Sequence, residues 1–228
     1  MADDAAGENP TLFDETAADF TARVDKLINA GRYRRGNLFL SAAASTVPPT
    51  GDILDYGCGP GRISSLLARQ GFNVLGVDPS PGMISVAKRQ HLDKLRVKFE
   101  LCESWSIGAQ VGVFDAIVCS SVIEYEAQPA ELLRKFHRAL RPSGVLIISF
   151  ANSRSLSRAL FQRRNLHLGA QVHTWTDRQF CELLEQSGFK PIRQTIYFES
   201  VFDRLLSLGV LSASELIGAL GLVVAARQ

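Results

Sequence analysis

Three glycines at alternate positions follow a short apolar segment that contains an acid, and residues of these types can bind a cofactor. The segment Ile53-Leu54-Asp55-Tyr56 is typical of a buried strand, and Gly57, Gly59 and Gly61 follow it directly. Glycine allows positive φ angles and lets the backbone approach a ligand closely, because no Cβ is in the way. The apolar residues after Arg62 predict a helix, whose first amides would point at the same ligand. The pattern therefore predicts a strand, a cofactor loop and a helix.

The spacing of these glycines and the nearby acids distinguish between cofactors. A dinucleotide-binding loop has the pattern G-x-G-x-x-G, whereas here Arg62 stands where the last glycine would be. The carboxylate of Asp55 would repel a pyrophosphate, but it would attract a ligand with an ammonium group and a sulfonium. S-adenosylmethionine is such a ligand. Asp78 ends the next apolar segment about 20 residues later, and its two oxygens could bind both hydroxyls of a ribose, as in NAD sites.

Four segments, in order, resemble the motifs of class I S-adenosylmethionine-dependent methyltransferases. Residues 54–61 stand where that family has its first motif, and residues 77–83 resemble its second. Residues 114–125 are similar to the fourth strand and its loop, and residues 140–148 to the turn into the fifth strand. The resemblance is closest over residues 51–150, and the joint occurrence is more specific than any one motif. It implies an α/β, Rossmann-like fold with a seven-stranded mixed sheet, the last strand antiparallel, and S-adenosylmethionine as the cofactor, released as S-adenosylhomocysteine.

The resemblance also implies which residues hold the cofactor and where methyl transfer takes place. Glu124 follows the fourth strand and would lie over the reactive end of the cofactor. Ubiquinone-type O-methyltransferases have a Glu-His pair linked to a divalent metal at a similar place, but this chain has Glu124-Tyr125-Glu126. We therefore expect no metal requirement; the acidic pair also fits a capping role at a helix start. The expected cofactor-binding residues are Asp55, Gly57, Cys58, Gly59, Gly61, Arg62, Asp78, Pro79, Met83, Glu103, Ser104 and Ser120.

The histidines are the remaining candidates for acid–base chemistry, and the chain has 4 of them. His91 lies among polar residues at an expected helix end, which predicts a surface position. His137 lies beside leucines in an expected helix at 131–140, which predicts a half-buried side chain. His167 and His173 flank Gly169, close to the expected entry of the substrate. Either one could act as the general base, with Glu124 as the other candidate.

A basic segment follows the expected fifth strand. Arg154, Arg158, Arg163 and Arg164 occur between residues 151 and 167 without an acid among them. The segment 151–175 is too long for an ordinary connection and predicts an inserted helix over the carboxyl ends of the strands. Arginine binds carboxylate or phosphate with two parallel hydrogen bonds, so Arg154 and Arg158, with Tyr125, are candidate contacts for an anionic acceptor. A solvated helix face is the alternative.

Alternating strand and helix signals begin at Gly51 and predict a parallel sheet with helices on both faces. Residues 1–50 form a leading segment, expected to be helical over 11–46 and either to cover the cofactor or to pack on the domain. Residues 51–228 then form the methyltransferase domain. The expected strands lie at 52–56, 73–77, 97–101, 114–119, 145–150, 192–198 and 221–226.

Composition limits the partners. Lysine and arginine number 25 against 23 acidic residues, a net charge of +2 that is too small to predict nucleic-acid binding. The 4 cysteines show no C-x-x-C spacing, so we expect reduced thiols, no zinc site and a cytoplasmic protein. The apolar segment 201–226 is interrupted by charges and glycines, which favours a core helix and a buried strand over contact with a membrane surface. The sequence leaves the oligomeric state open.

These features together predict an enzyme that methylates a small molecule, most readily at oxygen. The alternatives are an N-methyltransferase acting on an amino sugar or another amine, a lipid-quinone methyltransferase that uses the apolar C-terminal segment, and a non-catalytic protein that binds S-adenosylmethionine. The Arg-rich segment after the fifth strand suggests secondary, sugar or lipid metabolism, but only by analogy with the family. The identity of the acceptor is not encoded in any of these motifs.

Overall fold

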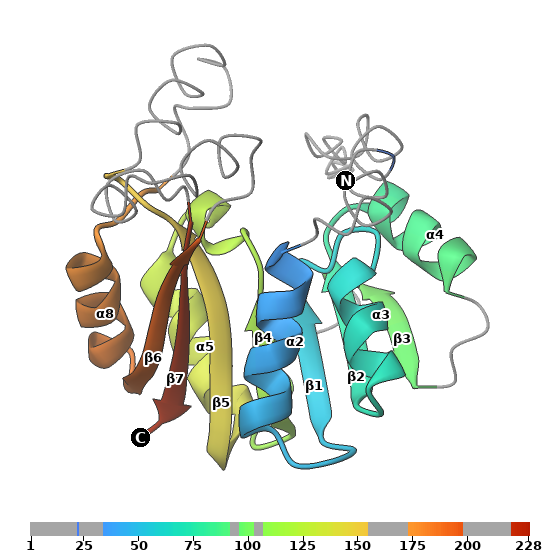
Figure 1. Ribbon diagram of the computed structural model, residues 1–228, viewed down its shortest axis with the longest axis horizontal. Coiled ribbons are helices and arrows are strands. Elements are labelled where there is room, and N and C mark those ends of the chain that lie inside the picture. Colours follow the sequence, from blue (N-terminus) through green and yellow to red (C-terminus); the bar gives the residue numbers. More distant parts are fainter. Residues whose placement is uncertain (1–21, 23–33, 92–95, 103–106, 155–172, 198–219) are drawn as a thin grey trace, which may run out of the picture.

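The computed structural model describes residues 22, 34–91, 96–102, 107–154, 173–197 and 220–228. In these residues one seven-stranded sheet carries helices on both faces, with strand order β3-β2-β1-β4-β5-β7-β6 (Figure 1). The strands are β1 (Asp52–Tyr56), β2 (Asn73–Asp78), β3 (Val97–Leu101), β4 (Phe114–Cys119), β5 (Leu140–Ala151), β6 (Phe189–Tyr197) and β7 (Leu220–Arg227). The helices are α2 (Arg34–Thr46), α3 (Arg62–Arg69), α4 (Pro81–Gln90), α5 (Pro129–Ala139) and α8 (Asp177–Gln186), with short 3-10 turns η2 (Ile107–Ala109) and η3 (Ile123–Tyr125).

The strand order reverses between β1 and β4. From β1 the chain moves outward through β2 to β3, then returns to pair β4 with the other side of β1; all these pairs, and β4 with β5, are parallel. The last strand, β7, is antiparallel to both β5 and β6. In open α/β sheets ligands bind beyond the carboxyl ends of the strands at such a reversal. The loops after β1, β2 and β4 are therefore brought to the same place.

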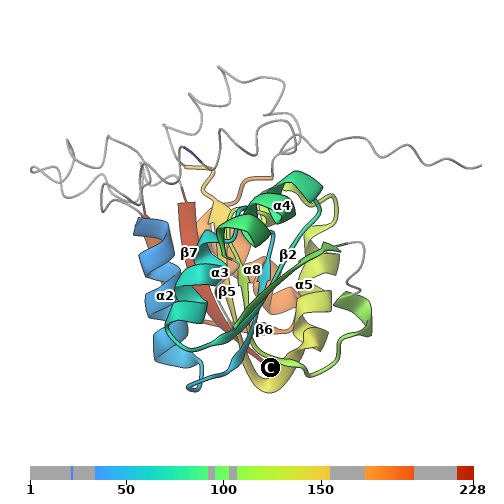
Figure 2. The same cartoon turned by 90° about the vertical axis from the view of Figure 1, so that its right-hand side faces the viewer.

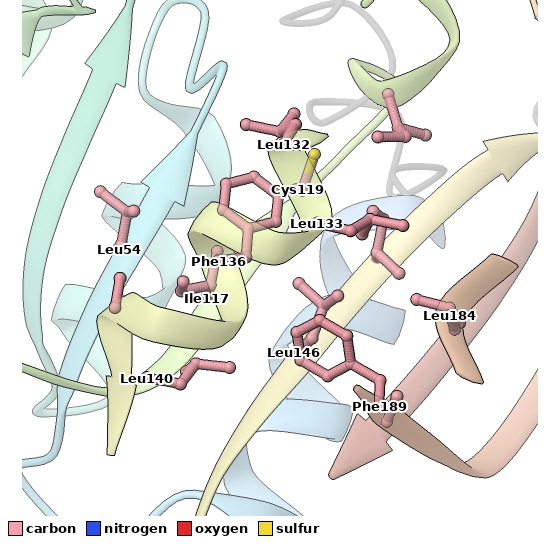
Figure 3. Close-up of a cluster of buried hydrophobic side chains, with 14 of the residues drawn as sticks. Leu54, Ile117, Cys119, Leu132, Leu133, Phe136, Leu140, Leu146, Leu184 and Phe189 are labelled. Atoms are coloured by element: carbon pink, nitrogen blue, oxygen red, sulfur yellow. The ribbon is translucent and has the colours of Figure 1, made fainter. Parts of the chain in front are cut away.

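The central strands are buried on both faces, as expected for a parallel sheet covered by helices. Alternate residues of each strand point to opposite faces, so Leu54 packs toward α5 while its neighbour Ile53 packs toward α2 and α3. Figure 2 shows α2 and α5 on opposite sides of the sheet. Figure 3 shows side chains of α5, α8 and the strands in the cluster on the α5 side.

Helix α2 is part of this core. Phe39 and Ala43 are fully buried and share a hydrophobic cluster with Ile53 of β1 and Leu67 of α3. This stretch of the expected leading segment therefore packs on the face of the sheet. The remainder of the leading segment lies outside the described residues, so its expected role as a cofactor cap stays a prediction.

Local sequence signals explain where several helices begin. Ser80 caps α4, because its Oγ accepts a hydrogen bond from the Met83 N–H at 3.1 Å, and Pro81 occupies the first turn. Thr176 and Gln179 form a capping box at the start of α8. Helix α3 begins instead after Gly61, whose φ of 78° places it in the left-handed region. The cofactor loop and the start of α3 are thus one continuous turn.

All seven expected strands are confirmed, and the largest difference is the start of β5. Residues 140–144 were expected to form a turn, but β5 begins at Leu140, which pairs with Phe114. The pairing of β4 with β5 shifts register between the pairs Phe114–Leu140 and Ala116–Val145, so the extra residues lie in β5. Pro142 is one of them and precedes Val145, the first β5 residue paired with β7. The Arg141 guanidinium contacts Asp115 and lies 3.0 Å from Asp52, which links the starts of β1, β4 and β5.

Expectations about the cysteines, the C-terminal segment and membrane contact can also be compared with the structure. The 4 cysteines carry free thiols, as expected. The strand expected at 221–226 is confirmed as β7, whereas the helix expected before it lies outside the described residues. Among the helices of the described ranges, none is long and apolar enough to cross a membrane.

Replacing Phe136 with alanine should lower the free energy of unfolding by about 3–5 kcal/mol, the usual cost of a cavity left by a large buried aromatic side chain. Phe136 is fully buried on α5 and packs edge-on against Tyr56 of β1, with ring centroids 5.2 Å apart. Urea denaturation measures this loss. Arg134→Ala, at an exposed position of the same helix, is the matched control and should change stability by less than about 0.5 kcal/mol.

Candidate functional site

The loop after β1 is the centre of the site, and backbone hydrogen bonds fix its path. Gly57, Gly59 and Gly61 all have positive φ angles, of 71°, 53° and 78°. The N–H groups of Gly57 and Cys58 both donate to the carbonyl of Val77 at the end of β2, at 2.8 and 3.0 Å. The expectation that these glycines serve an unusual backbone path is confirmed by these angles.

The three glycines differ in what surrounds them. A Cβ at Gly57 would stand 2.2 Å from Cγ2 of Val122, and one at Gly61 would stand 2.5 Å from the Phe99 ring. At Gly59 no atom of the described residues lies within 4 Å of that point. Protein packing therefore excludes a side chain at the outer two positions, while none of the described residues fills the space beside Gly59. This arrangement fits a cofactor lying against the backbone of the middle glycine.

Asp78 joins the loops that follow β1 and β2. One carboxylate oxygen accepts a hydrogen bond from the Gly59 N–H at 2.8 Å, and the other accepts one from the Ser80 N–H at 2.9 Å. A carboxylate oxygen can accept more than one hydrogen bond, so a carboxylate at this place is a group of the type that can bind ribose hydroxyls. Met83 is buried beneath this turn and Pro79 is exposed on it. Asp78, expected to hold the ribose, thus lies where the loops after β1 and β2 meet; its contact with a ribose stays a prediction.

Asp55 is a buried acid at the end of β1, with 1% of its surface exposed. Burial raises its pKa to about 6, although the Ser64 hydroxyl donates a hydrogen bond to it at 2.5 Å. A cation beside this carboxylate would offset the cost of its burial. The neighbouring Cys58 is also buried, and burial raises the pKa of its thiol, so the thiol is not reactive at neutral pH. Arg62, half-buried, is the first residue of α3.

The turn after β4 lies across the first glycine, through Val122. Ser121 has a φ of 55°, unusual for a residue other than glycine. Its N–H donates to the Oγ of Ser149, a fully buried residue of β5, at 2.9 Å. Ser120, an expected cofactor contact, is half-buried in the same turn. No sequence pattern indicated the contact between Ser121 and Ser149, because it joins a turn to a strand residue that is distant in sequence.

The structure brings two of the catalytic candidates together. Glu124 is buried in η3, with 1% exposed, and its carbonyl accepts a hydrogen bond from the His173 N–H at 2.7 Å. The chain continues to Trp175, whose N–H bonds the Ala151 carbonyl at 3.0 Å. Residues 173–175 thus run between the end of β5 and η3. The third candidate, His167, lies outside the described residues.

A second acid lies beside Glu124. The Tyr56 hydroxyl of β1 donates a hydrogen bond to Oε1 of Glu126 at 3.4 Å. Burial raises the pKa of both groups, so Tyr56 remains protonated at neutral pH. Tyr125 lies between the two acids in sequence and is 46% exposed. Its expected contact with the acceptor stays a prediction.

The remaining residues named from the sequence are Arg154, two histidines, and five residues that lie outside the described ranges. Arg154 is exposed just beyond β5, and its N–H bonds Oδ1 of the buried Asn152 at 3.0 Å. His137 is half-buried, as expected. The surface position expected for His91 is wrong: only 7% of it is exposed, because it folds back against the cofactor loop. Glu103, Ser104, Arg158, Arg163 and Arg164 lie outside the described residues.

Within the ranges that the structure describes, no three His, Cys, Asp or Glu side chains are grouped so that they could hold a metal ion. The expectation of a metal-independent site rests on the sequence, where a tyrosine replaces the histidine of the Glu-His pair. It stays a prediction.

Replacing Asp78 with alanine should weaken binding of S-adenosylhomocysteine by about 1.5–3 kcal/mol, the range for hydrogen bonds to a charged group. The loss has two sources, the ribose contacts and the bond to the Gly59 N–H. Isothermal titration calorimetry measures it. Asp78→Asn keeps one acceptor oxygen and should lose less. Unchanged affinity in a folded alanine variant would show that another acid holds the ribose.

If Asp55 binds the ligand's ammonium as expected, the affinity for S-adenosylhomocysteine should fall about tenfold between pH 7 and pH 5, because the contact needs an ionised Asp55 and burial raises the pKa of that residue to about 6. Titrations in two buffers of different ionisation enthalpy should show proton release near pH 6. The Asp55→Asn variant should bind more weakly and lose this part of the pH dependence.

The stability of the free protein should fall as pH rises, whereas the affinity for the ligand should rise. Because burial raises the Asp55 pKa above its ordinary value of 3.8, its contribution to stability is complete below that value and is lost as pH rises through about 6. Asp55→Asn should therefore stabilise the free protein at pH 8, by on the order of 1–3 kcal/mol. Thermal unfolding without ligand measures this. Equal stability of both proteins at pH 8 would contradict the raised pKa.

Comparison with known proteins agrees with this geometry. Residues 28–194 match the family described as a methyltransferase domain. A ubiquinone biosynthesis O-methyltransferase of Ruegeria pomeroyi is 31% identical over 184 residues, which span 71% of this chain and 72% of that protein. A magnesium protoporphyrin IX methyltransferase of Synechocystis, solved with bound S-adenosylhomocysteine, has a TM-score of 0.69 at 20% identity, covering 95% of this chain and 96% of that one.

A second solved structure shares the fold. An S-adenosylmethionine-dependent methyltransferase of Mesorhizobium loti has a TM-score of 0.64 at 22% identity, covering 82% of this chain and 96% of that one. The chain thus combines a family match over most of its sequence with the glycine loop, the acid that ends β2 and the order of the strands. The chain therefore belongs to the methyltransferase domain family and is a class I S-adenosylmethionine-dependent methyltransferase.

Proposed function

We propose that the enzyme transfers a methyl group from S-adenosylmethionine to a hydroxyl oxygen of a small aromatic acceptor. The observation that carries this proposal is the position of Glu124, a carboxylate that is 1% exposed and follows β4 beside the cofactor loop. Val122, two residues earlier, packs directly on Gly57. The carboxylate is thus close in the chain to a residue that contacts the cofactor loop.

A buried carboxylate at this place suits a hydroxyl acceptor better than an acidic one. Methyl transfer from a sulfonium depends chiefly on alignment of the acceptor with the methyl group. A hydroxyl must also lose its proton, so a nearby base accelerates the reaction, whereas a carboxylate or phosphate acceptor has no proton to lose. A carboxylate would also repel an anionic acceptor. The buried Glu124 therefore favours the hydroxyl.

A row of aromatic side chains that ends at His173 supports a flat acceptor. Phe150 and Phe180 stack at 4.2 Å between ring centroids, Trp175 lies 5.4 Å from Phe180, and His173 stacks on Trp175 at 5.6 Å. The row begins in the core and ends at the exposed His173, whose backbone bonds Glu124. Aromatic rings pair favourably in such offset arrangements. The relative in Ruegeria pomeroyi, named for ubiquinone biosynthesis, supports the same substrate chemistry.

The roles of the residues follow from these positions. Asp55, Gly59 and Asp78 would hold the cofactor, which when bound supplies an electrophilic methyl group on a positively charged sulfur. Glu124 would accept the proton of the acceptor hydroxyl, with His173 as the second candidate for that task. Glu126 accepts the hydrogen bond of the Tyr56 hydroxyl and is less buried than Glu124, so we take it as the weaker candidate.

A panel of acceptors tests the substrate class. Catechol, 3,4-dihydroxybenzoate, benzoate and phenethylamine each present a different group to the same cofactor. We expect O-methylated catechol or dihydroxybenzoate, identified by mass spectrometry, and at least tenfold slower methylation of the other two. A preference for dihydroxybenzoate over catechol would favour an anionic acceptor held by Arg154. Methylation of the amine alone would overturn the proposal, and binding of S-adenosylhomocysteine without any turnover would favour a non-catalytic protein.

Replacing Glu124 with glutamine should lower kcat for a phenolic acceptor by about 100-fold, the lower range for loss of a general base. Binding of S-adenosylhomocysteine should change less than twofold, because the cofactor is held from β1 and β2. Glu126→Gln is the matched control and should lose far less activity. A chelator should have no effect on the wild-type enzyme. Weaker cofactor binding in Glu124→Gln, with an unchanged kcat at saturating cofactor, would show a structural role only.

A further inference from the structure

We propose that His91 is a positioning residue that holds the far end of the cofactor loop and so contributes to cofactor affinity. His91 directly follows α4, and its ring turns inward until only 7% of the residue is exposed. Its Nε2 lies 3.3 Å from the carbonyl oxygen of Pro60, in the loop, and its Nδ1 lies 2.7 Å from the Ser65 hydroxyl, in α3. The ring thus connects α4 to the loop and to the helix that continues it.

The neutral ring with its hydrogen on Nε2 satisfies both contacts. A carbonyl oxygen only accepts hydrogen bonds, so Nε2 must carry the hydrogen that is donated to Pro60. In the neutral ring Nδ1 then has a free lone pair, and the Ser65 hydroxyl donates to it. Phe99 of β3 packs beside the ring, with centroids 5.9 Å apart. Histidine therefore supplies a donor, an acceptor and a flat apolar surface at one place.

The contacts from β2 and from His91 lie on either side of Gly59, the middle glycine of the cofactor loop. Val77 and Asp78 of β2 hold the N–H groups of Gly57, Cys58 and Gly59. His91 holds the next carbonyl along the chain, that of Pro60. Gly59, the glycine with open space where its Cβ would be, therefore lies between tethers from two different elements. A loop held in its binding conformation before the ligand arrives does not lose that entropy on binding.

Gly61 shows that the ring also shapes the loop sterically. A Cβ at Gly61 would stand 3.1 Å from Cδ2 of His91 and closer still to Phe99. The φ of 78° at Gly61 starts α3, so the ring closes the space on the inner side of that turn. The loop cannot shift toward α4 without displacing His91.

Three variants of His91 separate these contributions. His91→Gln can place an amide N–H near the Nε2 position and keep the bond to Pro60. His91→Asn is too short to reach Pro60 but can still bond Ser65. His91→Phe keeps the ring and loses both hydrogen bonds. We expect calorimetric affinity for S-adenosylhomocysteine to fall at least tenfold in the asparagine and phenylalanine variants and less than threefold in the glutamine variant.

Hydrogen exchange of the free protein gives a readout that a general loss of stability would not reproduce. Amides of the peptide covering residues 57–61 should exchange faster in His91→Asn, while those of β4 and β5 keep their wild-type rates. Wild-type affinity in a folded His91→Asn or His91→Phe variant would overturn the proposal, and so would an equal loss in the glutamine and asparagine variants. Because S-adenosylhomocysteine binding needs no acceptor, the result is independent of the proposed O-methylation.

Discussion

The carboxylate of Asp78 is the interaction on which the rest of the site depends. Its two oxygens hold the N–H groups of Gly59 and Ser80, and these belong to the loops after β1 and β2. One acid at the end of a strand therefore orders both loops that flank the expected ribose position. Because a carboxylate oxygen can accept more than one hydrogen bond, a group of this type can support the fold and also bind a ligand. If Asp78 binds the ribose as expected, its structural and binding roles are therefore not separable.

The reversal of strand order explains why the acceptor side of the site lies where it does. Returning to β4 beside β1 brings the turn after β4 over the first glycine, through Val122. The same turn continues into η3 and Glu124, and the contact between Ser121 and Ser149 holds it to β5. Methyl donor and proton acceptor would thus be positioned by neighbouring parallel strands, which are rigid elements of the fold.

Burial of charge is a cost that this site carries in the free protein. The raised pKa of Asp55 comes chiefly from its removal from water. A cation that approaches a buried carboxylate stabilises its ionised form. The ammonium of S-adenosylmethionine is such a cation. Part of the cofactor affinity would then come from relief of an unfavourable state in the free enzyme, and this links affinity to pH.

The sequence by itself determined the strands, the glycine loop and the two acids at the ends of β1 and β2, since hydrophobic runs, glycine torsions and strand-end positions are local properties of the chain. Tertiary structure decided which distant residues meet. His91 has polar sequence neighbours, yet it is buried because the end of α4 lies against the loop. Likewise, only packing brings His173 to Glu124. Such contacts depend on how elements pack, and no local pattern encodes them.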